Sequence, residues 1–176
     1  IYEGREENNK NIEKIFSISS KKQIGTVVFD NPKNIKQSLT KSLKTTWSNT
    51  SPNERSEILN KIANNIEEEP YELIYFLINE AGKTIQNAID EIREAVDFLR
   101  YYSNQILKIS DASDLEGPTG EENLITYTSK GRFLCISPWN FPVAILIGQI
   151  SAALACGNKV IVKPSEHTSI LGYLVV

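Results

Sequence analysis

Two short polar segments in the second half of the chain contain residue types that suit a bound nucleotide. Asn140 lies in residues 137–141, and Lys163 and Glu166 lie in residues 163–166. A lysine ammonium can donate to a ribose hydroxyl or a phosphate, and a carboxylate can accept from both ribose hydroxyls, which favours NAD over its 2′-phosphorylated form. A solvated strand end followed by a helix cap accounts for the same residues and stays open as the alternative.

Each polar segment follows an apolar segment that predicts a buried strand. Residues 133–137 and 160–162 are continuous apolar runs, typical of strands buried on both faces. Residues 142–156 between them predict an apolar helix, and strand, helix, strand with short connections is a βαβ unit with parallel strands. Because ligands bind beyond the carboxyl ends of parallel strands, we expect Asn140 and Lys163 at the same sheet edge. No glycine-rich phosphate loop occurs, so a nucleotide would need other contacts.

The first half of the chain is predicted to be mainly helical. A short strand is expected at residues 23–30, and residues 90, 91, 93 and 97 are expected on a solvated helix face. Ser51, Pro52 and Glu54 form a capping-box pattern that predicts a helix start. Apolar residues recur at helical spacing in four segments, which are residues 32–47, 52–66, 71–81 and 85–106.

These segments predict an α/β fold, in which a helical amino-terminal half precedes the first βαβ unit of a Rossmann-like parallel sheet. Residues 1–22 are polar and without periodicity, so we expect a loop or a poorly ordered segment there. Residues 23–110 form the mainly helical part, and residues 111–123 are expected to be a loop at a subdomain boundary. Residues 124–176 hold a pair of strands, at 124–128 and 133–137, and the second of these strands begins the βαβ unit.

Composition excludes several classes of function. The 19 Lys and Arg residues against 22 Asp and Glu residues leave a net charge of -3, so nucleic acid is not expected as a partner. Cys135, Cys156 and the single histidine are too few for a zinc site, and no metal is expected. Both cysteines lie in apolar runs, which favours buried, reduced thiols, with a disulfide between them as the alternative. Without a signal peptide or a membrane-spanning run, we expect a cytoplasmic protein.

Several motifs resemble those of a known family. Ser-Pro-Trp-Asn-Phe-Pro at 137–142, with Gly-Asn-Lys-Val at 157–160 and Lys-Pro-Ser-Glu at 163–166, resembles the amino-terminal half of the cofactor domain of aldehyde dehydrogenases. Glu-Ala-Gly-Lys-Thr at 80–84 and the helix at 91–102 resemble, more narrowly, the 1-pyrroline-5-carboxylate dehydrogenase module of the bifunctional proline utilisation A family. The resemblance implies a partial aldehyde dehydrogenase fold and NAD-dependent oxidation of L-glutamate 5-semialdehyde to L-glutamate in proline catabolism.

The resemblance also implies roles for matching residues. Asn140 would donate from its amide to the oxyanion that forms when a thiolate attacks the aldehyde, although an Asn here also caps turns. Phe141 and Glu94 would line the substrate pocket, and Glu94 has an exposed helix carboxylate as its alternative. Trp139 has core packing as its alternative. The residues implied to contact NAD are Ile136, Ser137, Pro138, Trp139, Lys163, Ser165 and Glu166.

The family's catalytic cysteine and glutamate follow later in its sequence, and neither Cys135 nor Cys156 lies in the nucleophile's motif. Ile1 in place of Met and the apolar residues 172–176 indicate a chain cut at both ends. We therefore expect an amino-terminal fragment that is inactive alone and needs the missing carboxyl-terminal half. A non-catalytic remnant, or one half of a split enzyme, is the alternative, and an unrelated helical binding module is a remote third. Whether a flavin-dependent proline dehydrogenase module precedes Ile1 stays open.

Overall fold

The computed structural model describes residues 12–42, 44, 46–110 and 114–176. The helices are α1 (Pro32–Ser42), α2 (Pro52–Glu68), α3 (Tyr71–Asn79), α4 (Ile85–Ser110), α5 (Ala144–Ala155) and α6 (Ser169–Leu174), with short 3-10 turns at Trp47–Asn49 and Glu166–Thr168. The strands are β1 (Ile12–Phe16), β2 (Gln23–Val28), β3 (Asp114–Leu115), β4 (Asn123–Leu124), β5 (Arg132–Ile136) and β6 (Lys159–Lys163). They pair in three two-stranded sheets among the described residues.

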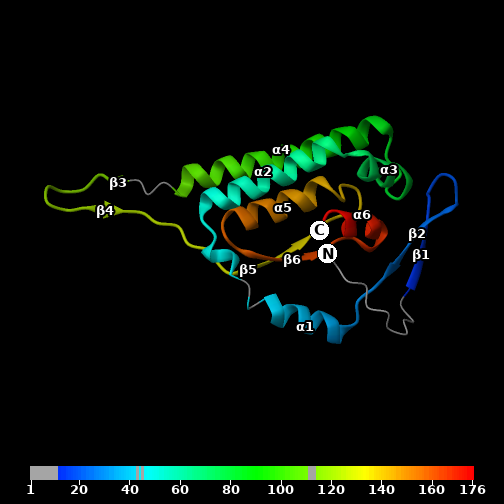
Figure 1. The fold of residues 1–176 in the computed structure, drawn as a ribbon, viewed down its shortest axis with the longest axis horizontal. Coiled ribbons are helices and arrows are strands. Elements are labelled where there is room, and N and C mark those ends of the chain that lie inside the picture. The colour runs from blue at the N-terminus through cyan, green and yellow to red at the C-terminus, as the bar shows by residue number, and fades with distance from the viewer. Residues whose placement is uncertain (1–11, 43, 45, 111–113) are drawn as a thin grey trace.

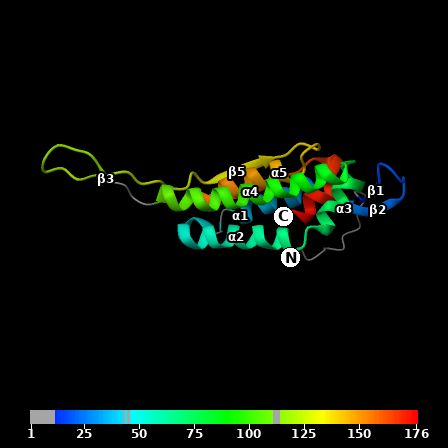
Figure 2. The same cartoon turned by 90° about the horizontal axis from the view of Figure 1, so that it is seen from above.

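The long helices form one layer and the parallel strands another. In Figure 1, α4, α2 and α5 run side by side above β5 and β6, and α1 lies below the strands. The β3–β4 hairpin extends away from the body at one end, and Figure 2 shows β1 and β2 at the other. The α5 helix therefore lies between the helical half of the chain and its parallel sheet.

The hydrophobic core joins the two halves of the chain. Ala63 on α2, Ala88 and Ala95 on α4, and Ala144 on α5 are fully buried, and these small side chains let the helices approach closely. Gly148 on α5 extends this close approach, since an added Cβ would press on the ring of Phe98. The helical half and the βαβ unit thus share one core.

Predictions that rest on local sequence signals are confirmed. At the start of α2, Ser51 Oγ accepts from the backbone N–H of Glu54, and the Glu54 carboxylate accepts from the backbone N–H of Ser51. The α4 helix spans 26 residues and follows the predicted periodicity. The parallel pairing of β5 with β6 is confirmed, and α5 connects them. The α/β architecture is as expected.

Predictions for the amino-terminal segment need correction. Residues 12–22, expected as loop, contain β1, because backbone pairing with β2 supplies what the sequence pattern lacks. Residues 1–11 lie outside the described part. The first helix ends at Ser42, short of Trp47, whose indole N–H donates to the Leu154 carbonyl at 3.0 Å. Leu43 of the predicted stripe also lies outside the described residues.

Predictions around the middle of the chain also need correction. Within residues 111–123, expected as loop, β3 begins a small hairpin, and the strand expected at 124–128 shrinks to β4. Only Asn123 and Leu124 face a partner strand there, and an alternating pattern without a partner forms no ladder.

Burial was overestimated for β5 and for Cys156. On β5, expected to be buried on both faces, Phe133, Leu134 and Ile136 are 43%, 60% and 53% exposed, because β6 is its one neighbour among the described strands. Cys135 is buried as expected, but Cys156 is exposed at the carboxyl end of α5, and both thiols are free. Among the described residues, no helix is long and apolar enough to cross a membrane.

Gly157 follows α5 and packs closely against α2, so a substitution there tests this contact. Its φ is +75°, and an added Cβ would collide with the guanidinium of Arg55, which is buried on α2. We expect Gly157→Ala to lower the free energy of unfolding in urea by about 2 kcal/mol, from left-handed strain and the displacement of Arg55. The matched control is Gly120→Ala, because Gly120 has φ +94° but open space around it. Equal losses in the two variants would contradict this packing.

Candidate oxyanion and cofactor site

The carboxyl ends of β5 and β6 bring the two polar segments together. Ile136 pairs with Lys163 at the ends of the strands, and the backbone N–H of Ser137 donates to the Lys163 carbonyl at 3.3 Å. The segment with Asn140 and the segment with Glu166 therefore leave the sheet at the same edge, as the spacing predicts (Figure 1). The amino termini of α5 and α6 follow these segments.

Lys163 and Glu166 form an exposed pair at this edge. Lys163 Nζ lies 3.5 Å from Glu166 Oε2 and also donates to the Pro164 carbonyl at 3.3 Å. The pKa of the Glu166 carboxyl lies below its ordinary value because its own backbone N–H donates to it and the Lys163 ammonium is close. An ionised carboxylate beside an ammonium offers both an acceptor and a donor to a diol such as ribose.

The residues between β5 and α5 are arranged as an open surface. Trp139 is 56% exposed and Asn140 is exposed, so Trp139 does not pack in the core of this chain. Pro138 is half-buried. Ser137 is buried, and its Oγ has no hydrogen-bond partner among the described residues.

Ser165 has a structural task. It is buried, and its Oγ accepts from the backbone N–H of His167, which caps the short turn at Glu166–Thr168. This cap fixes the backbone directly before Glu166. The helix-cap alternative for this segment therefore holds for Ser165 and leaves Lys163 and Glu166 exposed.

Glu91 binds the backbone directly after the Asn140 segment. The sequence predicts Glu91 on a solvated face, which is wrong: the side chain is buried, and Oε1 accepts from the backbone N–H groups of Val143 and Ala144 at 2.8 and 3.2 Å. Glu91 Oε2 lies 2.7 Å from Lys83 Nζ. A buried carboxylate is stable here because an ammonium pairs with it and helix amides donate to it. Its place beside Ala88, Ile92 and Ala95 on the apolar stripe of α4 is the signal that sequence reasoning missed.

Glu80 does the same for the second segment. It is buried after α3, and its two oxygens accept from the backbone N–H groups of Ile170 and Leu171, each at 2.9 Å. Burial raises the pKa of Glu80, and the hydrogen bonds from the start of α6 act in the opposite direction. Each buried glutamate therefore accepts hydrogen bonds from the first amides of a helix, which is α5 after the Asn140 segment and α6 after the Glu166 segment. Glu80 lies in the Glu-Ala-Gly-Lys-Thr motif, whose sequence alone indicates no role for this residue.

The two residues expected to line a substrate pocket differ in their surroundings. Lys83 Nζ lies 4.1 Å from the centre of the Phe141 ring, so Phe141 joins the network of Lys83 and Glu91. Phe141 remains 38% exposed. Glu94 lies exposed on α4, one turn beyond Glu91 and outside this network. The structure thus connects Phe141 to the segment of Asn140 and leaves Glu94 apart.

The family profile described as aldehyde dehydrogenase family matches residues 5–176. The chain belongs to the aldehyde dehydrogenase family. It is 49% identical over 125 residues to the bifunctional protein PutA of Salmonella typhimurium, a match that covers 71% of this chain and 9% of that protein. It is 41% identical over 128 residues to the 1-pyrroline-5-carboxylate dehydrogenase of Geobacillus thermodenitrificans, which covers 73% of this chain and 25% of that protein.

Solved structures of the same family share this fold. Proline utilization A from Bdellovibrio bacteriovorus matches with a TM-score of 0.91 at 28% identity, over 97% of this chain and 18% of that chain. The 1-pyrroline-5-carboxylate dehydrogenase from Thermus with bound NAD matches with a TM-score of 0.86 at 31% identity, over 95% of this chain and 33% of that chain. The chain therefore spans a third or less of the length of these relatives, in the amino-terminal part of the family domain.

The residues at the sheet edge fit the ribose of a dinucleotide. Lys163 and Glu166 offer an exposed donor and acceptor. No group of three or more His, Cys, Asp or Glu side chains that could hold a metal ion occurs among the described residues.

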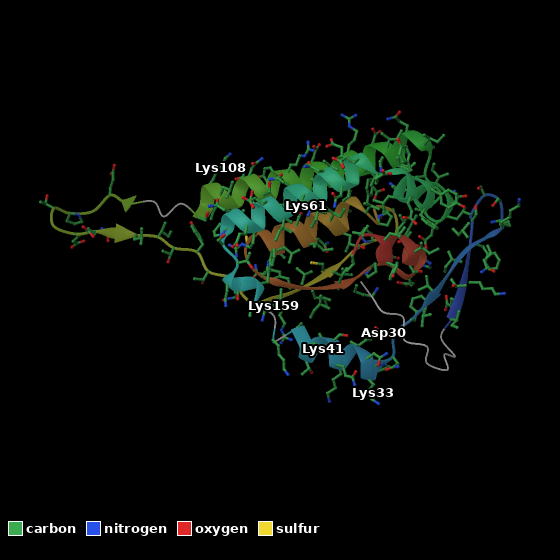
Figure 3. All side chains as sticks on the ribbon, in the orientation of Figure 1. Asp30, Lys33, Lys41, Lys61, Lys108 and Lys159 are labelled. Carbon is green, nitrogen blue, oxygen red and sulfur yellow. The ribbon has the colours of Figure 1, made fainter. Side chains whose placement is uncertain are left out.

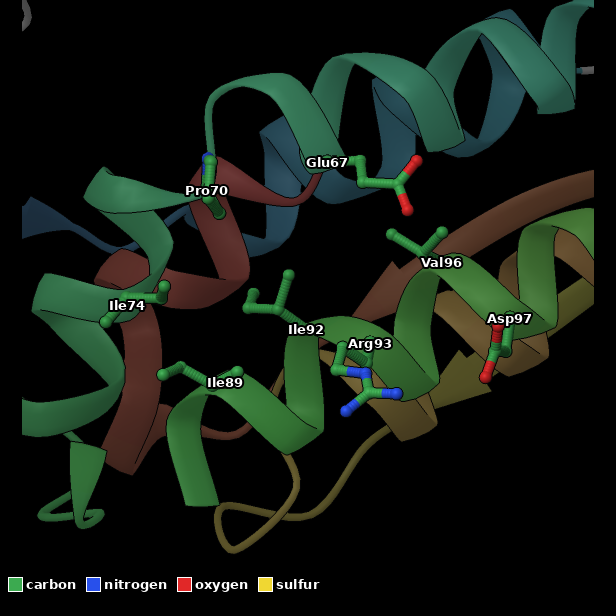
Figure 4. Close-up of a pocket in the computed structure, with 8 residues that line it drawn as sticks. All are labelled: Glu67, Pro70, Ile74, Ile89, Ile92, Arg93, Val96 and Asp97. Carbon is green, nitrogen blue, oxygen red and sulfur yellow. The ribbon is translucent and has the colours of Figure 1, made fainter. Parts of the chain in front are cut away.

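A separate pocket of about 300 Å³ lies between α4 and the junction of α2 with α3. Figure 4 shows Ile89, Ile92 and Val96 of α4 on one side and Ile74 of α3 on the other, and Arg93 of α4 also lines the pocket. The lining includes none of the residues at the edge of β5 and β6. We therefore place the candidate site at the sheet edge and not in this pocket.

The raised pKa of Glu80 gives a prediction about pH. A carboxyl whose pKa is higher in the folded state than its ordinary value of 4.5 contributes stability below that value, and the contribution is lost as pH rises through the raised pKa. As pH rises above 4.5, the free energy of unfolding of the parent chain should therefore fall relative to that of Glu80→Gln.

The control for this prediction has the opposite sign. Hydrogen bonds from Ser51 lower the pKa of Glu54, so its contribution is present above 4.5 and is lost as pH falls through the lowered pKa. Urea unfolding at a series of pH values should give opposite slopes for Glu80→Gln and Glu54→Gln. The same sign for both would contradict the assignment of Glu80 as a desolvated carboxyl.

Proposed function

We propose that this chain forms the oxyanion donor and the adenosine-ribose contacts of an NAD-dependent dehydrogenase that oxidises L-glutamate 5-semialdehyde to L-glutamate in proline catabolism. The observation that carries the proposal is the shared edge of β5 and β6, where Ile136 pairs with Lys163 and places the Asn140 segment beside Glu166. The identity of 41% to a 1-pyrroline-5-carboxylate dehydrogenase supports this substrate.

Lys163 and Glu166 hold the adenosine ribose in this proposal. The ionised Glu166 accepts from the two ribose hydroxyls, and Lys163 donates to a ribose oxygen. A carboxylate at this position repels a 2′-phosphate, which favours NAD over NADP. Ile136, Ser137, Pro138 and Trp139 line the cofactor cleft, and Ser165 holds the turn that presents Glu166. NAD, when bound, accepts the hydride from the aldehyde carbon.

Asn140 stabilises negative charge on the aldehyde oxygen. Its amide group donates a hydrogen bond as a nucleophile adds to the carbonyl, and Phe141, the next residue, faces the aliphatic chain of the substrate. The amide requires no change of protonation for this task. It acts by being held in place before the reaction begins.

The nucleophile has to come from outside the residues of this chain. Cys135 lies buried on β5, and its burial raises the pKa of the thiol and disfavours the thiolate. Cys156 lies at the carboxyl end of α5, with the length of that helix between it and the Asn140 segment. We therefore propose that the chain alone does not catalyse the oxidation.

A second role, as one half of an assembled enzyme, is favoured by the exposed side of β5. Phe133, Leu134 and Ile136 expose apolar surface beside a two-stranded sheet. Unpaired strand edges and apolar faces favour association with further strands. In this role the chain pairs with the carboxyl-terminal portion of the family domain.

NAD binding tests the proposed ribose contacts. We expect saturable binding of NAD to the chain by isothermal titration calorimetry, weakened about tenfold by Lys163→Ala and by Glu166→Ala, since each removes a hydrogen bond to a charged group. Glu166→Ala should also narrow the preference for NAD over NADP. Lys61→Ala is the control, because Lys61 lies exposed on α2 and away from the parallel strands (Figure 3). Unchanged affinity in both site variants would refute the assignment.

Absorbance of NADH tests the catalytic part. We expect no NADH from the chain with L-glutamate 5-semialdehyde and NAD, and NADH formation after it is mixed with the separately expressed carboxyl-terminal portion of the domain. Asn140→Ala should lower kcat of the mixture about 100-fold or more, the usual effect of removing an oxyanion donor. NADH formation by the chain alone would contradict the proposed absence of a nucleophile.

A further inference from the structure

The segment that contains Asn140 is fixed at its far end by a side chain from another part of the sequence. Residues 137–143 run from the end of β5 to the start of α5, and the first α5 amides are those of Val143 and Ala144. Val143 makes no side-chain cap, as its side chain is aliphatic. Glu91 takes the place of a local cap: it is 1% exposed, and Oε1 accepts from both amides. A buried helix start without such an acceptor would leave these donors unsatisfied.

Lys83 extends this support to the residue beside Asn140. Its ammonium lies 2.7 Å from Glu91 Oε2 and 4.1 Å from the centre of the Phe141 ring, and its side chain is 12% exposed. One cation thus contacts both the carboxylate that caps α5 and the aromatic ring next to Asn140. The ammonium–ring contact is strengthened by its partial burial.

We propose that Glu91 and Lys83 are positioning residues of the oxyanion site, which hold the backbone on both sides of Pro142 and thereby fix where the Asn140 amide lies. The proposal rests on the proposed function, in which Asn140 is the oxyanion donor. Neither side chain reaches the reacting atoms in this role. They act through backbone placement, and displacement of a donor by about 1 Å is enough to slow a reaction strongly.

The fluorescence of Trp139 tests the positioning without any enzyme assay. The chain contains two tryptophans, so Trp47→Phe leaves Trp139, one residue before Asn140, as the single reporter. In this background we expect Glu91→Gln, which loses the ion pair, and Lys83→Met, which leaves the carboxylate unpaired, to lower the anisotropy of Trp139. Both variants should also make Trp139 more accessible to acrylamide quenching. Asp90→Asn is the matched control, because Asp90 is exposed on the same helix.

A double variant keeps the test decisive if Lys83→Met fails to fold. Lys83→Met combined with Glu91→Gln leaves no unpaired buried charge and keeps an amide oxygen for the α5 amides. Its Trp139 signal should lie closer to the parent value than that of Lys83→Met alone. A variant that loses the native circular dichroism is left out of the comparison. If Lys83→Met is left out, the Trp139 signal of the double variant is compared with that of the Asp90→Asn control.

Kinetics of the assembled dehydrogenase separate positioning from general stability. We expect Glu91→Gln to lower kcat for the aldehyde about tenfold, with KM for NAD changed less than about twofold, because Lys163 and Glu166 lie on the other segment. Unchanged Trp139 signals in folded variants, or equal effects on kcat and on KM for NAD, would overturn the positioning role. Absence of any NADH from the parent assembly would count against the proposed function, and the Trp139 measurement would still decide the positioning.

Discussion

Two buried carboxylates hold the helices that begin at the candidate site. Glu91 accepts from the first amides of α5, and Glu80 accepts from the first amides of α6, in both cases where the helix follows a strand-end segment. Glu80 follows directly after α3, and Glu91 lies on the second turn of α4. The first amides of a helix have no partner within it, so a helix that starts inside a protein depends on such an acceptor. The positions of the Asn140 and Glu166 segments depend on these two contacts.

This constraint explains why the helical half and the sheet are one structural unit. One hydrophobic core includes residues of α2, α4 and α5. Glu91 and Glu80 add polar contacts to the starts of α5 and α6, next to the sheet edge. Burying each carboxylate costs solvation energy. Lys83 offsets this cost for Glu91, whereas for Glu80 the burial raises the pKa of the carboxyl, against the hydrogen bonds from the start of α6. The helical half of the chain therefore both forms the core and positions the segments of the candidate site.

The features that could be predicted from sequence are those encoded by neighbouring residues. The capping box at Ser51, the periodicity of α4 and the βαβ order of residues 132–163 each depend on short spacings, and the same-edge placement of Asn140 and Lys163 follows from the βαβ order. The burial of Glu91 and the pairing of β1 with β2 depend on residues far along the chain. A charged residue on a helix is normally solvated, and only its neighbours on the apolar stripe indicate otherwise.

Amide chemical shifts of the isotopically labelled chain during a titration with NAD test most directly whether the edge of β5 and β6 binds NAD. We expect saturable shift changes at Ser137, Trp139, Lys163 and Glu166, and unchanged peak positions for the residues that line the pocket beside α4. Shift changes confined to that pocket, around Ile89 and Arg93, or a spectrum unaltered by NAD would show that NAD does not bind at this edge.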